Sequence, residues 1–184
     1  MRILCYTSAR SWTGSARALE ATARGLAGRE HQVTLVCPPD SEIEQRLRYD
    51  SYEALPAAEA GVLPLAVWKL RRLLADRQVD ILLTTSESEH LAALAATRSR
   101  GHPVLVRRVA HGAASGGGWR TKLATRFGSP TMIASSDDEA SLLRARFAHA
   151  TTAMVPLGVD VFAHDSVRPV ARTTLGVDAE GGLI

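Results

Sequence analysis

With 184 residues, of which 46% are apolar, the chain can bury one good hydrophobic core but not two full domains. Its net charge is a modest +3 and its basic residues are scattered along the chain, which argues against a nucleic-acid-binding protein. Two cysteines form neither a disulfide framework nor a metal-ligand cluster, and no apolar run approaches the ~20 residues that cross a bilayer, so a cytoplasmic protein is expected.

The chain begins with a pattern that predicts a strand, a loop and a helix. Residues 2–7 form a short apolar run, and small apolar side chains recur at helical spacing in residues 15–27. A second strand is predicted at residues 32–37, because a β-rich run there ends at two prolines. These elements form a βαβ unit, in which the two strands run parallel.

The loop between the first strand and the first helix predicts an anion site. Its single glycine, Gly14, lies where the helix starts, with Thr13 before it and Ser15 after it as a candidate N-cap or N1 donor. The first N–H groups of a helix have no partner inside the helix, and the helix dipole favours negative charge there. We therefore expect phosphate to bind at Thr13, Gly14 and Ser15, with Arg10 or Arg17 nearby.

The rest of the chain continues to alternate helices and strands. Residues 111–118 are rich in glycine and predict a mobile loop, and Ser136 with Glu139 forms a capping box that opens a helix. The predicted helices are residues 42–48, 62–77, 89–99, 119–127 and 136–147, and the predicted strands are residues 51–55, 79–84, 104–109, 131–134 and 152–155.

This alternation predicts an α/β fold, namely a Rossmann-like parallel sheet with helices on both faces in a single three-layer domain. Ligands of such sheets bind beyond the carboxyl ends of the strands. The loops in which site residues are expected are therefore residues 8–15, 85–88, 110–118 and 135–137.

Taken together, several motifs resemble the N-terminal domain of a GT-B glycosyltransferase of the retaining family 4. The resemblance covers nearly the whole chain and depends on the order and spacing of RIL at 2–4, WTGSAR at 12–17, HQVTLV at 31–36, VDIL at 79–82, MIASS at 132–136 and VPLGVD at 155–160. The chain departs from the family pattern at Thr13, at residues 84–86 and at Leu157, where the family usually has a glycine, a histidine-containing segment and an asparagine.

The resemblance implies one half of a two-domain enzyme. Residues 1–160 would be the acceptor-side domain, and residues 161–184 would lead into an absent C-terminal domain that binds most of the donor. The implied reaction is transfer of a sugar from a nucleotide-sugar to a hydroxyl of a carbohydrate or lipid-linked acceptor, without a metal or other cofactor. This chain alone would be inactive.

The resemblance also assigns roles to individual residues. His111, just after the fifth strand, would contact the transferring sugar as the catalytic residue, while Ser86, Glu87, Arg108 and Trp119 would bind the acceptor. Arg107 and Arg108 alternate across their strand, so only one can face a pocket, and Arg107 is expected at a solvated edge or in a helix-facing salt bridge. The other histidines, at 31, 90, 102, 149 and 164, are expected on turns, helix surfaces or the tail, without a chemical role.

Two other classes of function are alternatives to the N-terminal domain of a glycosyltransferase. A dinucleotide-dependent oxidoreductase would need a glycine-rich G-x-G-x-x-G loop, whereas this loop has one glycine. A non-catalytic Rossmann-like binding or membrane-docking module is the closer alternative. In the helix predicted at residues 62–77, Trp68, Lys69, Arg71 and Arg72 lie off the apolar stripe, as in a helix bound to the inner membrane face, although a solvated helix surface explains them as well.

Overall fold

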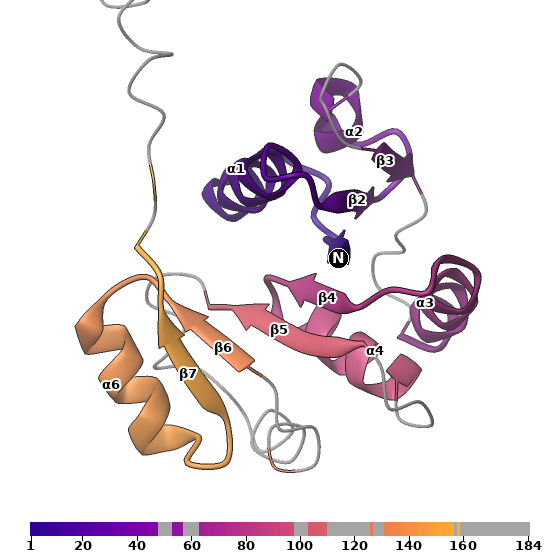
Figure 1. The fold of residues 1–184 in the computed structure, drawn as a ribbon. Coiled ribbons are helices and arrows are strands. Elements are labelled where there is room, and N and C mark those ends of the chain that lie inside the picture. The colour runs from indigo at the N-terminus through magenta and orange to yellow at the C-terminus, as the bar shows by residue number, and fades with distance from the viewer. Residues whose placement is uncertain are drawn as a thin grey trace, which may run out of the picture.

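The computed structural model describes residues 1–47, 53–56, 63–97, 103–109, 126, 131–156 and 158. Within them, seven strands form one parallel sheet in the order β3-β2-β1-β4-β5-β6-β7 (Figure 1). The strands are β1 (Arg2–Tyr6), β2 (Gln32–Cys37), β3 (Glu53–Pro56), β4 (Ile81–Thr84), β5 (Val104–Arg108), β6 (Thr131–Ala134) and β7 (Thr151–Met154). This confirms the predicted Rossmann-like α/β fold.

Helices cover both faces of the sheet. Helices α1 and α6 lie against one face and α3 and α4 against the other, while α2 lies near the β3 edge (Figure 1). Their bounds are α1 (Gly14–Ala27), α2 (Glu42–Leu47), α3 (Leu63–Arg77), α4 (Glu87–Thr97) and α6 (Asp137–Arg146). The sheet is therefore the middle layer of three, as the alternating sequence pattern predicts.

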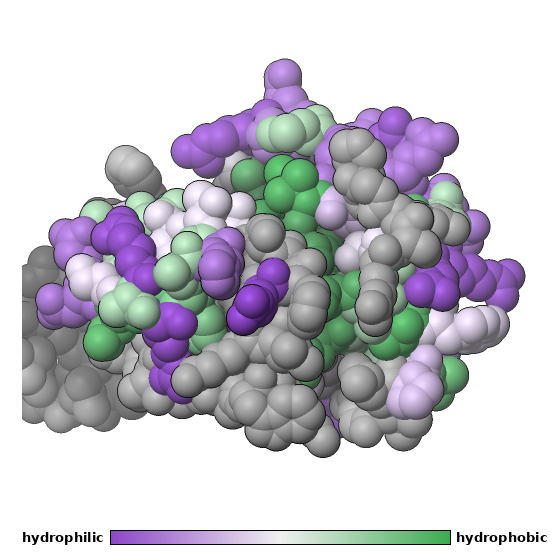
Figure 2. Space-filling view, turned by 90° about the horizontal axis from the view of Figure 1, so that it is seen from below, coloured by the Kyte–Doolittle hydropathy of each residue, from purple (hydrophilic) through white to green (hydrophobic). Residues whose placement is uncertain are grey.

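Strand side chains alternate between two hydrophobic layers, because successive residues of a strand point to opposite faces. On the α1 face, Ile3 and Cys5 of β1 pack with Leu19. On the α3 and α4 face, Leu4 and Tyr6 pack with a second set of apolar residues that includes Leu70. Seen from below, green apolar residues gather in the middle of the molecule between purple hydrophilic ones (Figure 2).

The predicted apolar stripe of the third helix is confirmed in α3. Ala66, Leu70 and Leu74 are buried, and Val67 and Leu73 are half-buried against the same core. These residues recur every three or four positions, which puts them on one side of the helix.

The N-cap of α1 and the first residue of α4 differ from the sequence prediction. Helix α1 begins at Gly14, and its N-cap is Thr13, whose side chain accepts from the Ala16 amide, so the prediction that Ser15 is the N-cap or the N1 residue is wrong. Helix α4 begins at Glu87 rather than Glu89. The capping box of α6 is confirmed, because the Ser136 side chain accepts from the amide of Glu139.

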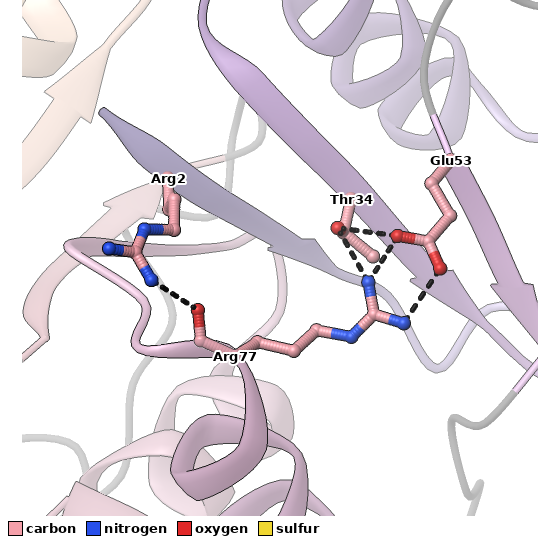
Figure 3. A network of polar contacts seen from close by, with 4 residues as sticks. All are labelled: Arg2, Thr34, Glu53 and Arg77. Carbon is pink, nitrogen blue, oxygen red and sulfur yellow. Dashed lines mark hydrogen bonds and ion pairs between the residues drawn. The ribbon is translucent and has the colours of Figure 1, made fainter.

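The edge strand β3 is fixed to α3 by a polar network at the amino ends of the strands (Figure 3). Arg77 forms an ion pair with Glu53, and Thr34 contacts both of them. The hydrogen bonds from Arg77 hold the pKa of the Glu53 carboxyl below its usual range. A hollow of about 780 Å³ lies beside this network, at the opposite end of the sheet from the predicted ligand loops.

Candidate functional site

The strand order reverses between β1 and β4. From β1 the chain moves outward through β2 to β3, and it then returns so that β4 pairs with β1 on the other side. At such a switch point the loops that follow the two strands separate toward opposite faces, which opens a crevice at the carboxyl edge where ligands bind. The loops after β1 and β4 are thus the first place to look for a site.

One buried carboxylate joins these two loops. Glu89 is only 3% exposed, and its Oε1 accepts from the Ser8 amide at 2.7 Å and the Ser8 hydroxyl at 3.0 Å, with the Thr7 hydroxyl at 3.4 Å. Its Oε2 accepts from the amide of Thr85 at 3.0 Å, the hydroxyl of Thr85 at 3.1 Å and the amide of Ser86 at 2.8 Å. Oε1 therefore binds the loop after β1 and Oε2 binds the loop after β4, so Glu89 bridges the switch point.

The predicted phosphate-binding residues lie at the open N-terminus of α1. The Thr13 hydroxyl is 2.9 Å from the Ser15 hydroxyl, and Thr13 caps the helix through Ala16. No described residue accepts a hydrogen bond from the Gly14 or Ser15 amide. A Cβ added at Gly14 would have no atom within 4 Å, so a side chain there would meet no other atom of the protein.

A second carboxylate fixes the far end of the same loop. The Trp12 amide donates to Oε2 of Glu42 at 2.7 Å, and the Glu42 amide donates to the carbonyl of Arg10 at 3.0 Å. The Arg46 guanidinium lies 5.3 Å from the centre of the Trp12 ring. Arg10 itself donates to the Pro39 carbonyl at 3.2 Å. The loop after β1 is therefore held at its start by α4 and at its end by α2.

The loop after β4 brings two predicted acceptor residues next to buried polar groups. Ser86 and Glu87 are half-buried at the start of α4, and charge from Glu87 acts on Arg107 of β5. His90 is 2% exposed, and neither of its ring nitrogens has a hydrogen-bond partner in the described part of the chain. Burial, and secondarily the charge of Arg107, lower the pKa of His90 to about 4. The prediction that His90 lies on a helix surface is therefore wrong, because α4 turns it toward the sheet.

Arg107 and Arg108 point to opposite faces, and both are buried. Arg108 donates to the Thr22 hydroxyl of α1 at 3.3 Å and to the Val155 carbonyl at 3.5 Å. Arg107 is 7% exposed, and its Nε has no described partner. Of the two alternatives predicted for Arg107, the solvated edge is wrong, because the strand alternation turns the side chain under α4, where the charges of Glu87 and Glu89 act on it. The role of Arg108 in acceptor binding stays a prediction.

A second buried glutamate repeats the arrangement at the end of β6. Oε2 of Glu139 accepts from the Ser135 amide at 2.7 Å, while its Oε1 has no partner among the described residues. Burial lowers the pKa of Arg108, and the charge of Glu139 opposes that shift. Glu139 thus orders the turn into α6, but in the described part of the chain it forms no bond to the loop after β1.

Two predicted site residues, His111 and Trp119, lie outside the described residues, as does the rest of the predicted loop at 110–118. The described ranges contain no group of histidine, cysteine or acidic side chains that could hold a metal ion. The sequence analysis missed Glu89 as a site residue. The sequence did contain an indication that Glu89 caps a helix, because Ser86 and Glu89 have the same spacing as the capping box of Ser136 and Glu139.

A comparison with protein-family models supplies the identification. Residues 12–161 match the model described as Glycosyltransferase Family 4. The chain belongs to this family. The match begins near the end of the loop after β1, past Ser8, and includes Glu89 and all the later described strands and helices.

Solved structures place this family 4 chain in the GT-B fold. It superposes on a glycosyltransferase from Rickettsia africae with a TM-score of 0.76 and 14% identity, covering 97% of this chain and 50% of that one. HepE from Anabaena, solved with UDP and glucose, gives 0.70 at 18% identity, with 96% and 50% covered. Sucrose-phosphate synthase from Thermosynechococcus elongatus gives 0.69 at 13%, with 98% and 53% covered. No curated protein matches by sequence.

The chain spans about half the length of these solved structures. It corresponds to the N-terminal domain of a GT-B enzyme. None of its described helices is long and apolar enough to cross a membrane.

The two cysteines, Cys5 and Cys37, form no disulfide and are buried. Burial raises their thiol pKa values to about 12 and about 11.

Proposed function

We propose that the chain is the acceptor-binding half of a retaining glycosyltransferase, which transfers a sugar from a nucleotide-sugar to an acceptor hydroxyl. The observation that carries this proposal is the pair of amides at Gly14 and Ser15, which have no described acceptor at the N-terminus of α1, beside the switch point of a family 4 domain. The greater part of the nucleotide-sugar would bind to a second domain, and the acceptor would be a carbohydrate or a lipid-linked sugar.

The proposed role of the amides follows from the charge that develops in the reaction. As the bond between the sugar and the nucleoside diphosphate breaks, the bonding electrons leave with the diphosphate oxygen. N–H groups fixed near that oxygen stabilise its charge without having to reorient, as in an oxyanion hole. Gly14 and Ser15 lie at a helix N-terminus, where the helix dipole adds to this effect. The Thr13 side chain accepts from Ala16 and thereby fixes the first turn.

The loops after β4 and β5 are the proposed acceptor side. Ser86 and Glu87 open α4 at the carboxyl edge, and Arg108, Trp119 and His111 follow on β5 and beyond. In this proposal His111 contacts the transferring sugar, and the acceptor hydroxyl attacks from the same side as the departing diphosphate.

Replacement of Gly14 by alanine tests the phosphate site. An added methyl group meets no protein atom within 4 Å, and alanine favours helix more than glycine does, so the variant should be as stable as the original chain or more stable. The methyl group would nevertheless stand where a phosphate oxygen approaches the amide. We expect UDP to bind the variant at least about tenfold more weakly, as after the loss of one charged hydrogen bond.

The measurement is a titration of the ¹⁵N-labelled chain with UDP, followed through the Gly14 and Ser15 amide signals. Gly25 replaced by alanine is the matched control, because Gly25 lies in the same helix and its added Cβ would meet only the end of the Arg29 side chain, at 3.5 Å. Equal affinity of both variants and the original chain, or no response of these amides to UDP, would contradict the phosphate site.

A second candidate function, a membrane-docking module at the inner membrane face, is favoured by exposed apolar side chains on α3. Trp68 is 57% exposed and Leu65 is 39% exposed, one helical turn apart. Arg72 is exposed on the same helix, whereas Arg71 donates to the carbonyls of Ala95 and Ala96 at the end of α4. An indole beside a cation is typical of helices that lie at a membrane surface.

Replacement of Trp68 by alanine separates this candidate from a solvated helix surface. If α3 docks, the variant should partition about five- to tenfold more weakly into vesicles of phosphatidylcholine and phosphatidylglycerol, because about half of an indole no longer becomes buried. Co-sedimentation measures the partitioning, and Leu142→Ala, which removes a 55% exposed leucine from α6, is the control. Equal partitioning of the two variants, or none by the original chain, would rule out docking through Trp68.

A further inference from the structure

We propose that Glu89 is the positioning residue of the loop after β1, residues 7–13, which is called the phosphate loop below. It holds the start of the loop after β1 in the shape that leaves the Gly14 and Ser15 amides open toward a diphosphate. This inference rests on the proposed function of those amides. Glu89 itself touches no ligand in the proposal, because it acts through Ser8.

The first argument is that α4 fixes the Glu89 carboxylate, so that its hydrogen bonds with Ser8 hold the loop in place. Ser8 and Glu89 lie 81 positions apart in the sequence. The amide and the hydroxyl of Ser8 both donate to Oε1 of Glu89, at 2.7 and 3.0 Å. The other oxygen is fully engaged with the turn that caps α4. Because α4 packs on the sheet through Ala93 and Ala96, the carboxylate is fixed in place and the loop is held against it.

The second argument is the small number of other anchors in that loop. The Thr7 amide continues the sheet by donating to the Val36 carbonyl at 2.9 Å, and the Trp12 amide is held by Glu42. Between these points Arg10 is bonded to the Pro39 carbonyl and the Glu42 amide on the β2 and α2 side, and Ser8 is the residue whose amide and hydroxyl both reach α4, through Glu89. At its start, on the α4 side, the path from the strand to the helix therefore depends on the carboxylate of Glu89.

The third argument is that only a carboxylate satisfies this arrangement. In the described part of the chain, each Glu89 oxygen accepts from at least one backbone amide, which can only donate, and from a hydroxyl, whereas a carboxylate offers acceptors alone. A glutamine has the same shape but presents an NH₂ group to one of the two loops. With the side chain 3% exposed, water cannot repair the mismatch, so one loop must move away.

Glu139 supplies a matched comparison within the same chain. It also lies three residues after its helix N-cap, is 4% exposed, and accepts from the amide before that cap. Its second oxygen has no partner in the described residues, whereas the second oxygen of Glu89 binds the loop after β1. Substituting each glutamate by glutamine thus removes a similar capping interaction, but only one substitution affects Ser8.

The test uses the ¹⁵N-labelled 184-residue chain with inorganic pyrophosphate as the probe. In Glu89→Gln we expect pyrophosphate to bind about tenfold more weakly at the Gly14 and Ser15 amides, and in Glu139→Gln we expect less than a twofold change. Urea unfolding gives the stability of each variant, so the affinity is compared for folded protein only. A merely structural role would lower both stabilities and leave both affinities unchanged, and that result would overturn the proposal.

Two milder variants cover the case in which Glu89→Gln does not fold. Ser8→Ala removes a donor from the oxygen that faces the phosphate loop, and Thr85→Val removes one from the oxygen that faces α4. We expect weaker pyrophosphate binding in Ser8→Ala and unchanged binding in Thr85→Val. Equal effects in the two would contradict positioning through Ser8.

A readout without ligand separates this inference from the proposed function. If the original chain binds no pyrophosphate, the proposed phosphate site fails, but the amide signals of Gly14 and Ser15 still report the shape of the loop. They should shift in Glu89→Gln, or in Ser8→Ala, and remain in place in Glu139→Gln. Unshifted signals in the first two variants would overturn the role of Glu89 by themselves.

Discussion

A protein made of these 184 residues alone is expected to transfer no sugar to any acceptor, whereas the same residues joined to a donor-binding domain are expected to be active. The chain spans about half of the solved GT-B structures that it matches. In the proposed function it supplies leaving-group amides and His111, but not the surface that holds the nucleotide-sugar against the acceptor. Loss of such positioning can remove ~7–11 kcal/mol of barrier lowering, which leaves no detectable turnover.

The experiment compares the chain with a fusion to the C-terminal half of a family 4 glycosyltransferase, using several nucleotide-sugars. Both sugar transfer and donor hydrolysis are followed, since water can replace a missing acceptor. The C-terminal half alone and a fusion that carries His111→Ala are the controls. Turnover by the isolated chain at an ordinary enzymatic rate would contradict the half-enzyme proposal, and it would require a complete donor site within these residues or between two copies of them.

Acidification from pH 7 to pH 5 is expected to destabilise the fold through His90. Burial, and then the charge of Arg107, lower the pKa of its imidazole from 6.5 to about 4. Above pH 6.5 the histidine is neutral in the folded and the unfolded chain, so its contribution does not change with pH. Between pH 6.5 and about 4 only the unfolded chain takes up the proton, so stability falls as the pH falls.

The size of this effect follows from the width of that window. Each pH unit in it costs about 1.4 kcal/mol, so at pH 5 the fold should be about 2 kcal/mol less stable than at pH 7 on account of His90 alone. Glu87 and Glu89 lie close enough to Arg107 to raise its pKa, so they oppose the desolvation that lowers it. Other carboxylates add their own acid dependence, which the comparison of variants removes.

His90→Leu is expected to abolish this part of the acid sensitivity. Leucine replaces two buried ring nitrogens that have no described partner with apolar atoms of similar volume, which should also leave the protein at least as stable at pH 7. Urea unfolding at pH 7, 6 and 5 measures the difference, with the exposed His149→Leu as the control. If His90→Leu and the original chain lose the same stability between pH 7 and 5, the imidazole is not neutral in the folded protein.

The sequence by itself determined the elements and the family, because these depend on spacing within a few residues. Short apolar or β-rich runs located the strands, including β2 at its observed bounds before Pro38 and Pro39, and helical spacing of apolar residues located the helices. The capping box of Ser136 and Glu139 located the start of α6, and Gly14 located the start of α1. The GT-B assignment needed only the order of the motifs along the chain.

Only the tertiary structure decided which side chains meet. That β4 pairs with β1 depends on how the whole sheet is ordered, and no local pattern specifies it. This pairing brings Glu89 to Ser8 across 81 residues and turns a capping glutamate into a bridge between two loops. In the same way, strand alternation requires Arg107 and Arg108 to face opposite sides of the sheet. The packing of α4 and α1 decided that both arginines are buried. The packing of α4 also decided that His90 lies in the core. The physical reason is that burial and long-range hydrogen bonds depend on neighbours in space, which a linear pattern does not contain.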